Sequence, residues 1–237
     1  MGRKPKDASP MRRQIKVLAR DLLIRHGYRG VSFGDIASEL ETTRANIHYH
    51  FGNKQTLVEE VLEDYVDETL AGLTAAFVRE DLPLTAKIAE VIEISRRRHR
   101  RYNPSGKGTA PWSLIARMRQ DSEALTPKGR AALERFATEL DSAVTAAVRT
   151  ARDSGEFVET MPVEDVALQL VSMANSAAPI TQDSGDFDRL EQLYLAFGRI
   201  VQHAYGRSAR PVAVPGPGAA SLQHASGGRV ASGRRRG

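Results

Sequence analysis

Apolar residues recur at helical spacing from the start of the first ordered segment. Between Pro10 and about His26, large apolar side chains fall three or four positions apart, at Ile15, Leu18, Leu22 and Leu23. Basic residues occupy the positions between them, namely Arg12, Arg13, Lys16, Arg20 and Arg25. Such spacing places the two groups on opposite faces of an α-helix. We therefore predict a helix over 10–26, ended by Gly27.

A second, short helix begins at a clear capping signal. Ser32 precedes the apolar run and Asp35 follows three residues later, which is the spacing of a capping box. Val31 and Ile36 are placed to pack on each other across this start. The pattern predicts a helix that buries Ile36, Ala37 and Leu40.

A tight turn at Glu41 and Thr42 leads into a third helix, which Thr43 caps and which ends near His50. Ile47 and Phe51, four residues apart, belong to the core of the same small domain. Two short helices with a tight turn between them, packed on a longer helix, form a helix-turn-helix.

The remaining pattern predicts an all-α fold. Asn53 can cap a long helix from Lys54 to about Glu80, with Leu57, Val61, Tyr65, Leu73 and Phe77 along one side. Its length of roughly 40 Å suffices to leave the small domain and enter a second one. Five further helices are predicted, over Pro83–Arg101, Trp112–Asp121, Pro127–Ser154, Pro162–Ala178 and Asp186–Tyr205.

The sequence divides into four parts that differ in charge. They are a flexible basic N-terminus (1–9), a helix-turn-helix domain (10–53), a larger helical domain (54–205) and a disordered basic tail (206–237). Residues 1–54 hold 11 Lys and Arg against 5 Asp and Glu, 55–205 hold 17 against 24, and 206–237 hold 6 against none. A basic head on an acidic body indicates that the head faces a polyanion, of which nucleic acid is the obvious one.

Other classes of protein find little support. The chain has no cysteine, which excludes disulfides, thiolate metal sites and cysteine nucleophiles. It has no apolar run of the length that a signal peptide or membrane span needs, so we expect a cytoplasmic protein with no membrane partner. No Ser, His and carboxylate can be tied together by spacing, so we predict no enzyme and no cofactor. His48 and His50 point about 200° apart on a helix and cannot share a metal ion, so no metal site is predicted.

The segment from Ile36 to Lys54 resembles the signature of the tetracycline-repressor (TetR/AcrR) family of transcriptional regulators. The resemblance is specific over roughly residues 10–65 and only architectural beyond. It implies that the third helix enters the major groove of DNA, that the larger domain binds a ligand and dimerises, and that Tyr49 and Lys54 contact phosphates. In the turn, Glu41 stands where the family usually has glycine, so either the turn differs or a left-handed residue is strained by about 1 kcal/mol.

The first turn of the third helix is the predicted reading surface. Arg44 can fork onto a guanine, Asn46 can pair with an adenine, and Ala45 allows close approach. His48 faces DNA where the family commonly has Tyr. The predicted DNA-binding residues are Ser32, Thr43, Arg44, Ala45, Asn46, His48, Tyr49 and Lys54.

A few residues of the larger domain are candidates for ligand binding, and each also has an ordinary structural interpretation. Tyr65, Phe77, Trp112 and Met118 can line an effector pocket for a hydrophobic or aromatic small molecule, or can be ordinary core. A run of arginines ends the segment Pro83–Arg101, at Arg96, Arg97, Arg98, Arg100 and Arg101. It suits a solvated helix end, with an acidic effector or an extra DNA contact as the alternatives.

Dimerisation is expected in the last two predicted helices, which carry continuous apolar stripes. The predicted interface comprises Val166, Leu170, Leu190, Leu193, Tyr194, Phe197 and Val201. A homodimer implies an inverted-repeat operator in double-stranded DNA. The sequence thus predicts a repressor that a small molecule releases from a palindromic operator. The alternative is a DNA-binding regulator without a small-molecule effector.

Overall fold

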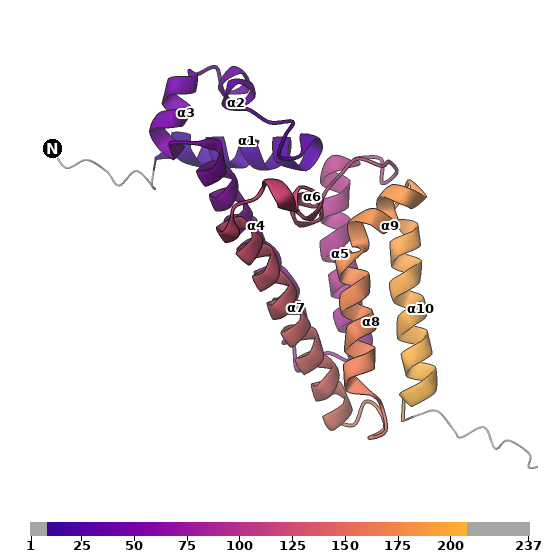
Figure 1. Cartoon of the computed structure of the whole chain (residues 1–237). Coiled ribbons are helices and arrows are strands. Elements are labelled where there is room, and N and C mark those ends of the chain that lie inside the picture. Colours follow the sequence, from indigo (N-terminus) through magenta and orange to yellow (C-terminus); the bar gives the residue numbers. More distant parts are fainter. Residues whose placement is uncertain (1–8, 208–237) are drawn as a thin grey trace, which may run out of the picture.

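The computed structural model describes residues 9–207, and these form ten α-helices and no strand (Figure 1). The helices are α1 (Pro10–His26), α2 (Phe33–Glu39), α3 (Arg44–Phe51), α4 (Lys54–Phe77), α5 (Leu84–Tyr102), α6 (Leu114–Gln120), α7 (Pro127–Asp153), α8 (Val163–Asn175), α9 (Ala177–Ser184) and α10 (Asp188–Tyr205). A short 3₁₀ turn, Ser122–Ala124, lies between α6 and α7. The predicted all-α class is confirmed. The predicted N-terminal extension, apart from residue 9, and the tail beyond 207 lie outside the described residues.

The first three helices form a small head at one end of the molecule. In Figure 1, α1 runs across the top and α2 and α3 lie over it. Ile15, Ile36, Ile47 and Phe51 are all buried at the centre of this head. The apolar positions recognised along the chain therefore do converge on one core.

The long helix α4 connects the head to the body. Asn53 caps it, because its side-chain oxygen accepts a hydrogen bond from Thr56 N at 2.9 Å. The first turns of α4 pack against α1 and α3, and the rest runs beside α7. Leu62 and Val66 of α4, like Leu140 and Val144 of α7, are fully buried. One helix thus belongs to both the head and the body.

The body consists of long helices that run along the axis of the molecule. Figure 1 shows α5, α7, α8 and α10 descending from the head, with the short helices α6 and α9 at the end near it. α8 packs against α7 and α10, and α10 also packs against α5. None of the helices in residues 9–207 combines the length and the apolarity that a membrane crossing requires.

One predicted helix is wrong in its extent. The segment Pro162–Ala178 is not continuous: α8 stops at Asn175, and α9 begins at Ala177. Pro179 explains the break, because proline lacks the N–H that would bond to Asn175 O and its ring would clash with that carbonyl. Gly185, with φ of +75°, ends α9 in a left-handed conformation. The other predicted helices agree with the structure to within about three residues at each end.

Candidate nucleic-acid interface

The first turn of α3 is fixed by its own side chains. Thr43 Oγ1 accepts a hydrogen bond from Asn46 N at 3.2 Å, and Asn46 Nδ2 donates to Thr42 Oγ1 at 3.0 Å. Thr43, Arg44 and Ala45 are exposed, and Asn46 is half-buried. The predicted reading residues therefore share one outward-facing turn, and the backbone beneath them is already ordered.

The N-terminus of α2 lies beside the first turn of α3. Ser32 makes the predicted capping box: its hydroxyl accepts from Asp35 N, and Asp35 Oδ2 accepts from Ser32 N at 2.7 Å. The pKa of Asp35 is lowered because its carboxylate accepts hydrogen bonds from the Ser32 hydroxyl, at 2.7 Å, and from Ser32 N. The Arg44 guanidinium lies so close to Gly34 that a Cβ there would come within 2.6 Å of Arg44 Nη2. Arg44 therefore rests across α2, near the Asp35 carboxylate.

The second turn of α3 offers an aromatic and a histidine. Tyr49 is 55% exposed. His48 is also exposed, but its ring meets the edge of Phe33, and its Nδ1 donates to Gly52 O at 2.8 Å. His48 is thus held by the loop that follows α3, and its Nε2 is left for an outside partner.

Lys54 begins α4 beside the same face. Its ammonium lies 4.4 Å from the centre of the Tyr28 ring, a cation–π contact. The pKa of Lys54 is lowered, because the effect of burial outweighs the opposite effect of the nearby carboxylates of Asp35 and Asp121. The side chain is therefore partly ordered beside the head, which suits a contact that sets position rather than sequence preference.

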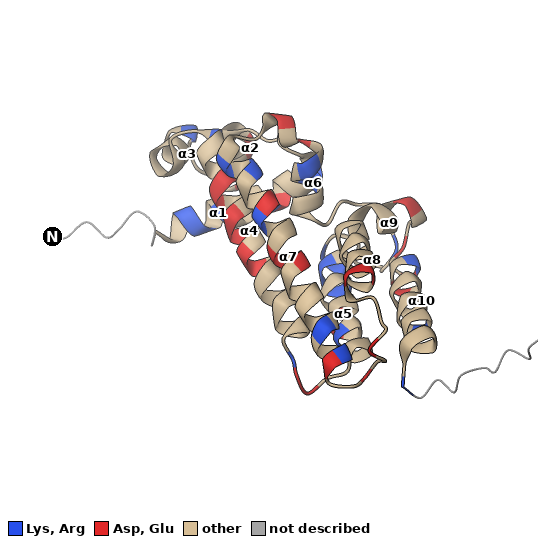
Figure 2. Ribbon diagram, turned by 60° about the horizontal axis from the view of Figure 1, so that its bottom comes forward, with Lys and Arg blue, Asp and Glu red and all other residues tan. Residues whose placement is uncertain are grey.

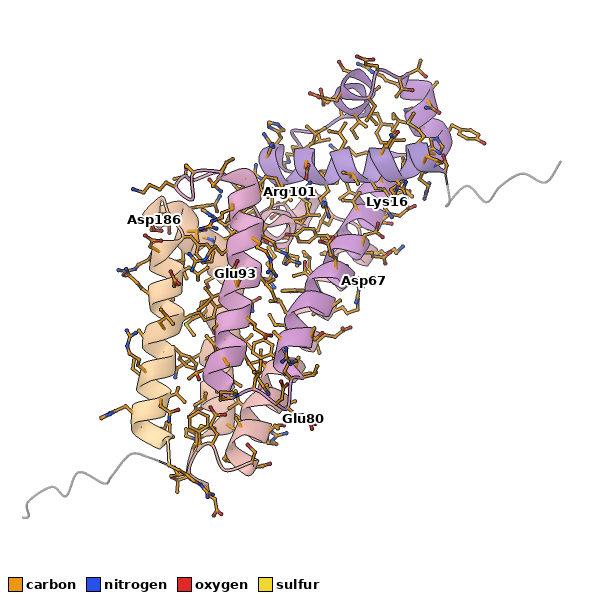
Figure 3. All side chains as sticks on the ribbon, turned by 180° about the vertical axis from the view of Figure 1, so that it is seen from behind. Lys16, Asp67, Glu80, Glu93, Arg101 and Asp186 are labelled. Atoms are coloured by element: carbon orange, nitrogen blue, oxygen red, sulfur yellow. The ribbon has the colours of Figure 1, made fainter. Side chains whose placement is uncertain are left out.

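Three basic residues of α1 form ion pairs with α4 that were not anticipated. Arg12 pairs with Glu60 at 2.5 Å, Lys16 pairs with Asp64, and Arg20 pairs with Glu68 at 2.9 Å. Figure 2 shows the carboxylates along this part of α4, and Figure 3 places Lys16 at the junction. The basic residues of α1 and the acidic residues of α4 each recur every four positions, so the sequence did contain a signal for this pairing. These basic side chains of α1 hold the head on α4 and are not a free phosphate-binding surface.

The far end of α1 and the α1–α2 turn contact the body. Tyr102 Oη donates to Asp21 Oδ1 at 2.7 Å, and Arg101 forms an ion pair with Asp21 at 3.0 Å. Asp121, which ends α6, accepts a hydrogen bond from Tyr28 N at 2.8 Å. The end of α5 and the end of α6 are therefore both tied to the head.

A family model described as bacterial regulatory proteins of the tetR family matches residues 15–61. This range covers most of α1, all of α2 and α3 and the start of α4. Over this segment the chain is similar to the tetR family of bacterial regulatory proteins. It is accordingly a DNA-binding transcriptional regulator. No curated protein sequence matches the chain.

Solved structures of bacterial transcriptional regulators share the fold over most of the chain. One from Rhodobacter sphaeroides has a TM-score of 0.70 at 19% identity, covering 81% of this chain and 98% of its own. One from Agrobacterium tumefaciens has a TM-score of 0.67 at 20% identity, covering 82% and 97%. A putative regulator from Saccharomonospora viridis, solved in complex with choline, has a TM-score of 0.67 at 21% identity, covering 83% and 97%. At these identities the likeness shows the fold.

The body contains a small cavity of about 50 Å³. Two of the predicted pocket residues, Tyr65 and Trp112, line it. Phe77 and Met118 are buried but do not line it. The sequence did not point to most of the wall, which includes Thr69, Leu73, Val91, Ser95, Ser113, Arg119, Phe136, Asn175 and Tyr194. These residues come from helices far apart in the chain, so only the folded structure brings them together.

A larger groove of about 520 Å³ lies between α5 and α10. Its lining includes Ile88, Tyr194, Leu195 and Arg199, and all of its residues belong to these two helices. Unlike the small cavity, it receives no residue from α4 or α6.

Most residues of the predicted dimer interface are buried within the subunit itself. Val166, Leu170, Leu190, Tyr194, Phe197 and Val201 are all buried in the chain's own core. Leu193 is 39% exposed, and Ile200, two turns further along α10, is 66% exposed. Any partner surface on α10 must therefore be built from this exposed edge and not from the centre of the stripe.

Proposed function

We propose that the chain is a homodimeric repressor in the cytoplasm that a small molecule releases from an inverted-repeat operator. In this proposal, α3 of each subunit reads one half of the operator in the major groove. A two-fold dimer presents two identical helices, which requires a palindromic site. The observation that carries the proposal is the capped and exposed first turn of α3, with Arg44, Ala45 and Asn46 side by side.

The test begins with selection of bound sites from a random pool of double-stranded DNA. Arg44→Ala should weaken binding to the selected operator by about 1–3 kcal/mol and relax the preference at one base pair of each half-site. Lys54→Ala should weaken binding to all sequences about equally, because a phosphate contact carries no sequence information.

Arg149→Ala is the matched control for these two variants. Arg149 is an exposed arginine in the last turns of α7, at the end of the body away from the head, and its only ion pair among residues 9–207 is with the exposed Glu164. Its loss should leave operator affinity unchanged. Full operator affinity in Arg44→Ala would remove α3 as the reading helix.

Release is proposed to act through α4 and α6. Tyr65, Thr69 and Leu73 line the cavity from α4, whose first residue is Lys54, and Arg119 lines it from α6 two residues before Asp121. A ligand that shifts either helix changes the angle between the head and the body. Such a ligand must bind the DNA-incompetent state more tightly, and operator DNA then weakens ligand binding by the same factor. A coupling of about 1–3 kcal/mol is the usual range.

One observation favours a regulator without an effector. The cavity of about 50 Å³ is far below the roughly 300–1,000 Å³ of typical ligand sites. A thermal-shift screen separates the two functions, since a ligand specific for the folded state raises the melting temperature. Choline, the ligand of the Saccharomonospora viridis structure, belongs in this screen as a cation.

A further inference from the structure

The fold assigns different roles to the arginines at the end of α5. Arg96 forms an ion pair with Glu191 of α10 at 2.5 Å, and Arg101 pairs with Asp21 of α1 at 3.0 Å. Arg98 instead lines the small cavity, with its guanidinium carbon 5.6 Å from the centre of the Tyr65 ring. No carboxylate among residues 9–207 lies within ion-pair distance of Arg98. The solvated helix end predicted from the sequence therefore does not describe this residue.

A second arginine enters the same cavity from α6. Arg119 Nη1 donates to the neutral side chain of Asn175 at 3.1 Å, and its guanidinium carbon lies 5.7 Å from the centre of the Phe136 ring. Burial lowers the pKa of Arg119, and no neighbouring carboxylate raises it. Within the part of the chain that is described, this cation also has no ionic partner.

The rest of the cavity wall supplies no negative charge. None of its residues is Asp or Glu, and it is otherwise apolar or neutral, with four aromatic rings at Tyr65, Trp112, Phe136 and Tyr194. Two of the neutral donors are in use: Thr69 Oγ1 donates to Tyr65 O, and Trp112 Nε1 donates to Thr181 Oγ1. The hydroxyl of Tyr194 is fully buried and has no hydrogen-bond partner among the described residues.

Two uncompensated cations in one partly desolvated space create a site for an anion. Electrostatic attraction is stronger in a cavity than in water, because the effective dielectric constant is lower. Guanidinium groups match the planar geometry of a carboxylate and bind it with two parallel hydrogen bonds. The aromatic wall accommodates an apolar body behind that carboxylate. Since no ion pair anchors Arg98 or Arg119, both side chains can move aside as the ligand enters the small cavity.

We propose that the effector is an apolar or aromatic organic acid whose carboxylate is bound jointly by Arg98 and Arg119, with the Tyr194 hydroxyl as a further donor. The regulatory role of the acid rests on the proposed function, but the existence of the acid-binding site does not depend on it. It selects one of the two alternatives that the arginine run allowed, an acidic effector over an extra DNA contact.

The test compares compounds of one shape and different charge. Full-length protein is titrated calorimetrically with benzoate, benzamide and benzylamine, and with octanoate and octanamide. The acids should bind at least about ten-fold more tightly than their neutral or cationic counterparts, a factor that corresponds to about 1.4 kcal/mol. Equal or tighter binding of the amides or the amine, or no binding by either acid at millimolar concentration, would overturn the proposal.

Variants then assign the site. Arg98→Gln and Arg119→Gln should each weaken acid binding by about ten-fold or more, because each removes a charge-assisted hydrogen bond. Arg100→Gln is the control: it makes the same change on the same helix, but Arg100 is exposed and does not line the cavity. Acid affinity that is unchanged in the double variant Arg98→Gln/Arg119→Gln would place the acid elsewhere and overturn the assignment.

A further measurement needs no ligand. If the two arginines are retained for binding, their uncompensated charge destabilises the empty protein, and the double variant should melt at a higher temperature than the wild type. A lower melting temperature would show that the arginines serve packing. Operator release is measured separately. Acids that bind without releasing DNA would refute the repressor mechanism but not the acid site. Release of DNA by choline or benzylamine alone would refute the acid site but not the repressor mechanism.

Discussion

At the scale of single residues, the turn between α2 and α3 carries an unusual backbone. Glu41 has φ of +49°, the only positive φ of a non-glycine residue between residues 9 and 207. The two possibilities left open by the sequence are thereby resolved, because the turn keeps the left-handed conformation that glycine usually provides. A side chain with a Cβ is strained there by about 1–2 kcal/mol. The recognition helix therefore keeps the geometry of a tight turn and bears the strain.

Glu41→Gly should relieve this strain and raise the free energy of unfolding by about 0.5–1 kcal/mol, after the entropy that glycine adds to the unfolded chain. For a chain of this size the melting temperature should rise by roughly 2–4 °C per kcal/mol, at fixed protein concentration. Glu39→Gly is the control, since Glu39 lies within α2 and its replacement should lower the melting temperature. A lower melting temperature in Glu41→Gly would mean that the turn is not strained.

At the scale of elements, α10 has one apolar edge that its own subunit does not cover. Leu193 and Ile200 lie two turns apart on that edge, whereas Tyr194 and Val201 beside them are buried against the body. Leu195 is also exposed, but it lines the groove that α10 forms with α5. The two exposed leucines of α10 therefore belong to different faces, which allows a matched comparison.

Leu193→Arg should convert the proposed dimer to monomers, because a charge on the shared face would be desolvated without a partner. Leu195→Arg, on the other face, should remain dimeric. Sedimentation velocity at micromolar concentration distinguishes the two states. An intact dimer for Leu193→Arg, or monomers for Leu195→Arg alone, would move the interface from the edge of α10 to another surface.

At the scale of the whole molecule, the orientation of the head depends on contacts beyond α4. Asp121 accepts a hydrogen bond from the backbone N–H of Tyr28, and Asp21 accepts a hydrogen bond from Tyr102 and pairs with Arg101. Figure 3 places Arg101 at the end of α5 beside the head. The helix α4 alone could bend, but together with these three contacts it fixes the angle between the head and the body. The end of α6 is thus both a wall of the cavity region and a support for the turn before α2.

Asp121→Ala should lower the free energy of unfolding by about 1–3 kcal/mol, because it leaves the Tyr28 N–H without its charged acceptor. Hydrogen exchange should speed up locally, in the turn between α1 and α2, more than in the core of the body. Glu123→Ala, two residues further on and exposed, should change stability by less than about 0.5 kcal/mol. Unchanged exchange at the α1–α2 turn would show that Asp121 does not hold the head.

The sequence by itself determined the features that depend on short-range interactions. The Ser32 capping box, the Thr43 and Asn53 caps and the helix end at Gly27 each involve hydrogen bonds or dihedral preferences within about four residues, so the pattern of residue types was sufficient. The same locality explains why the head and its reading turn could be recognised before the fold was known.

Only the tertiary structure decided which residues meet across the body. Arg98 and Arg119 belong to separate helices, and nothing in their local sequence indicates that they share a cavity without a carboxylate. The apolar stripe of α10 likewise could not reveal which of its members the subunit itself would bury. Hydrophobic periodicity identifies the face of a helix that avoids water, but the partner of that face depends on how the helices pack.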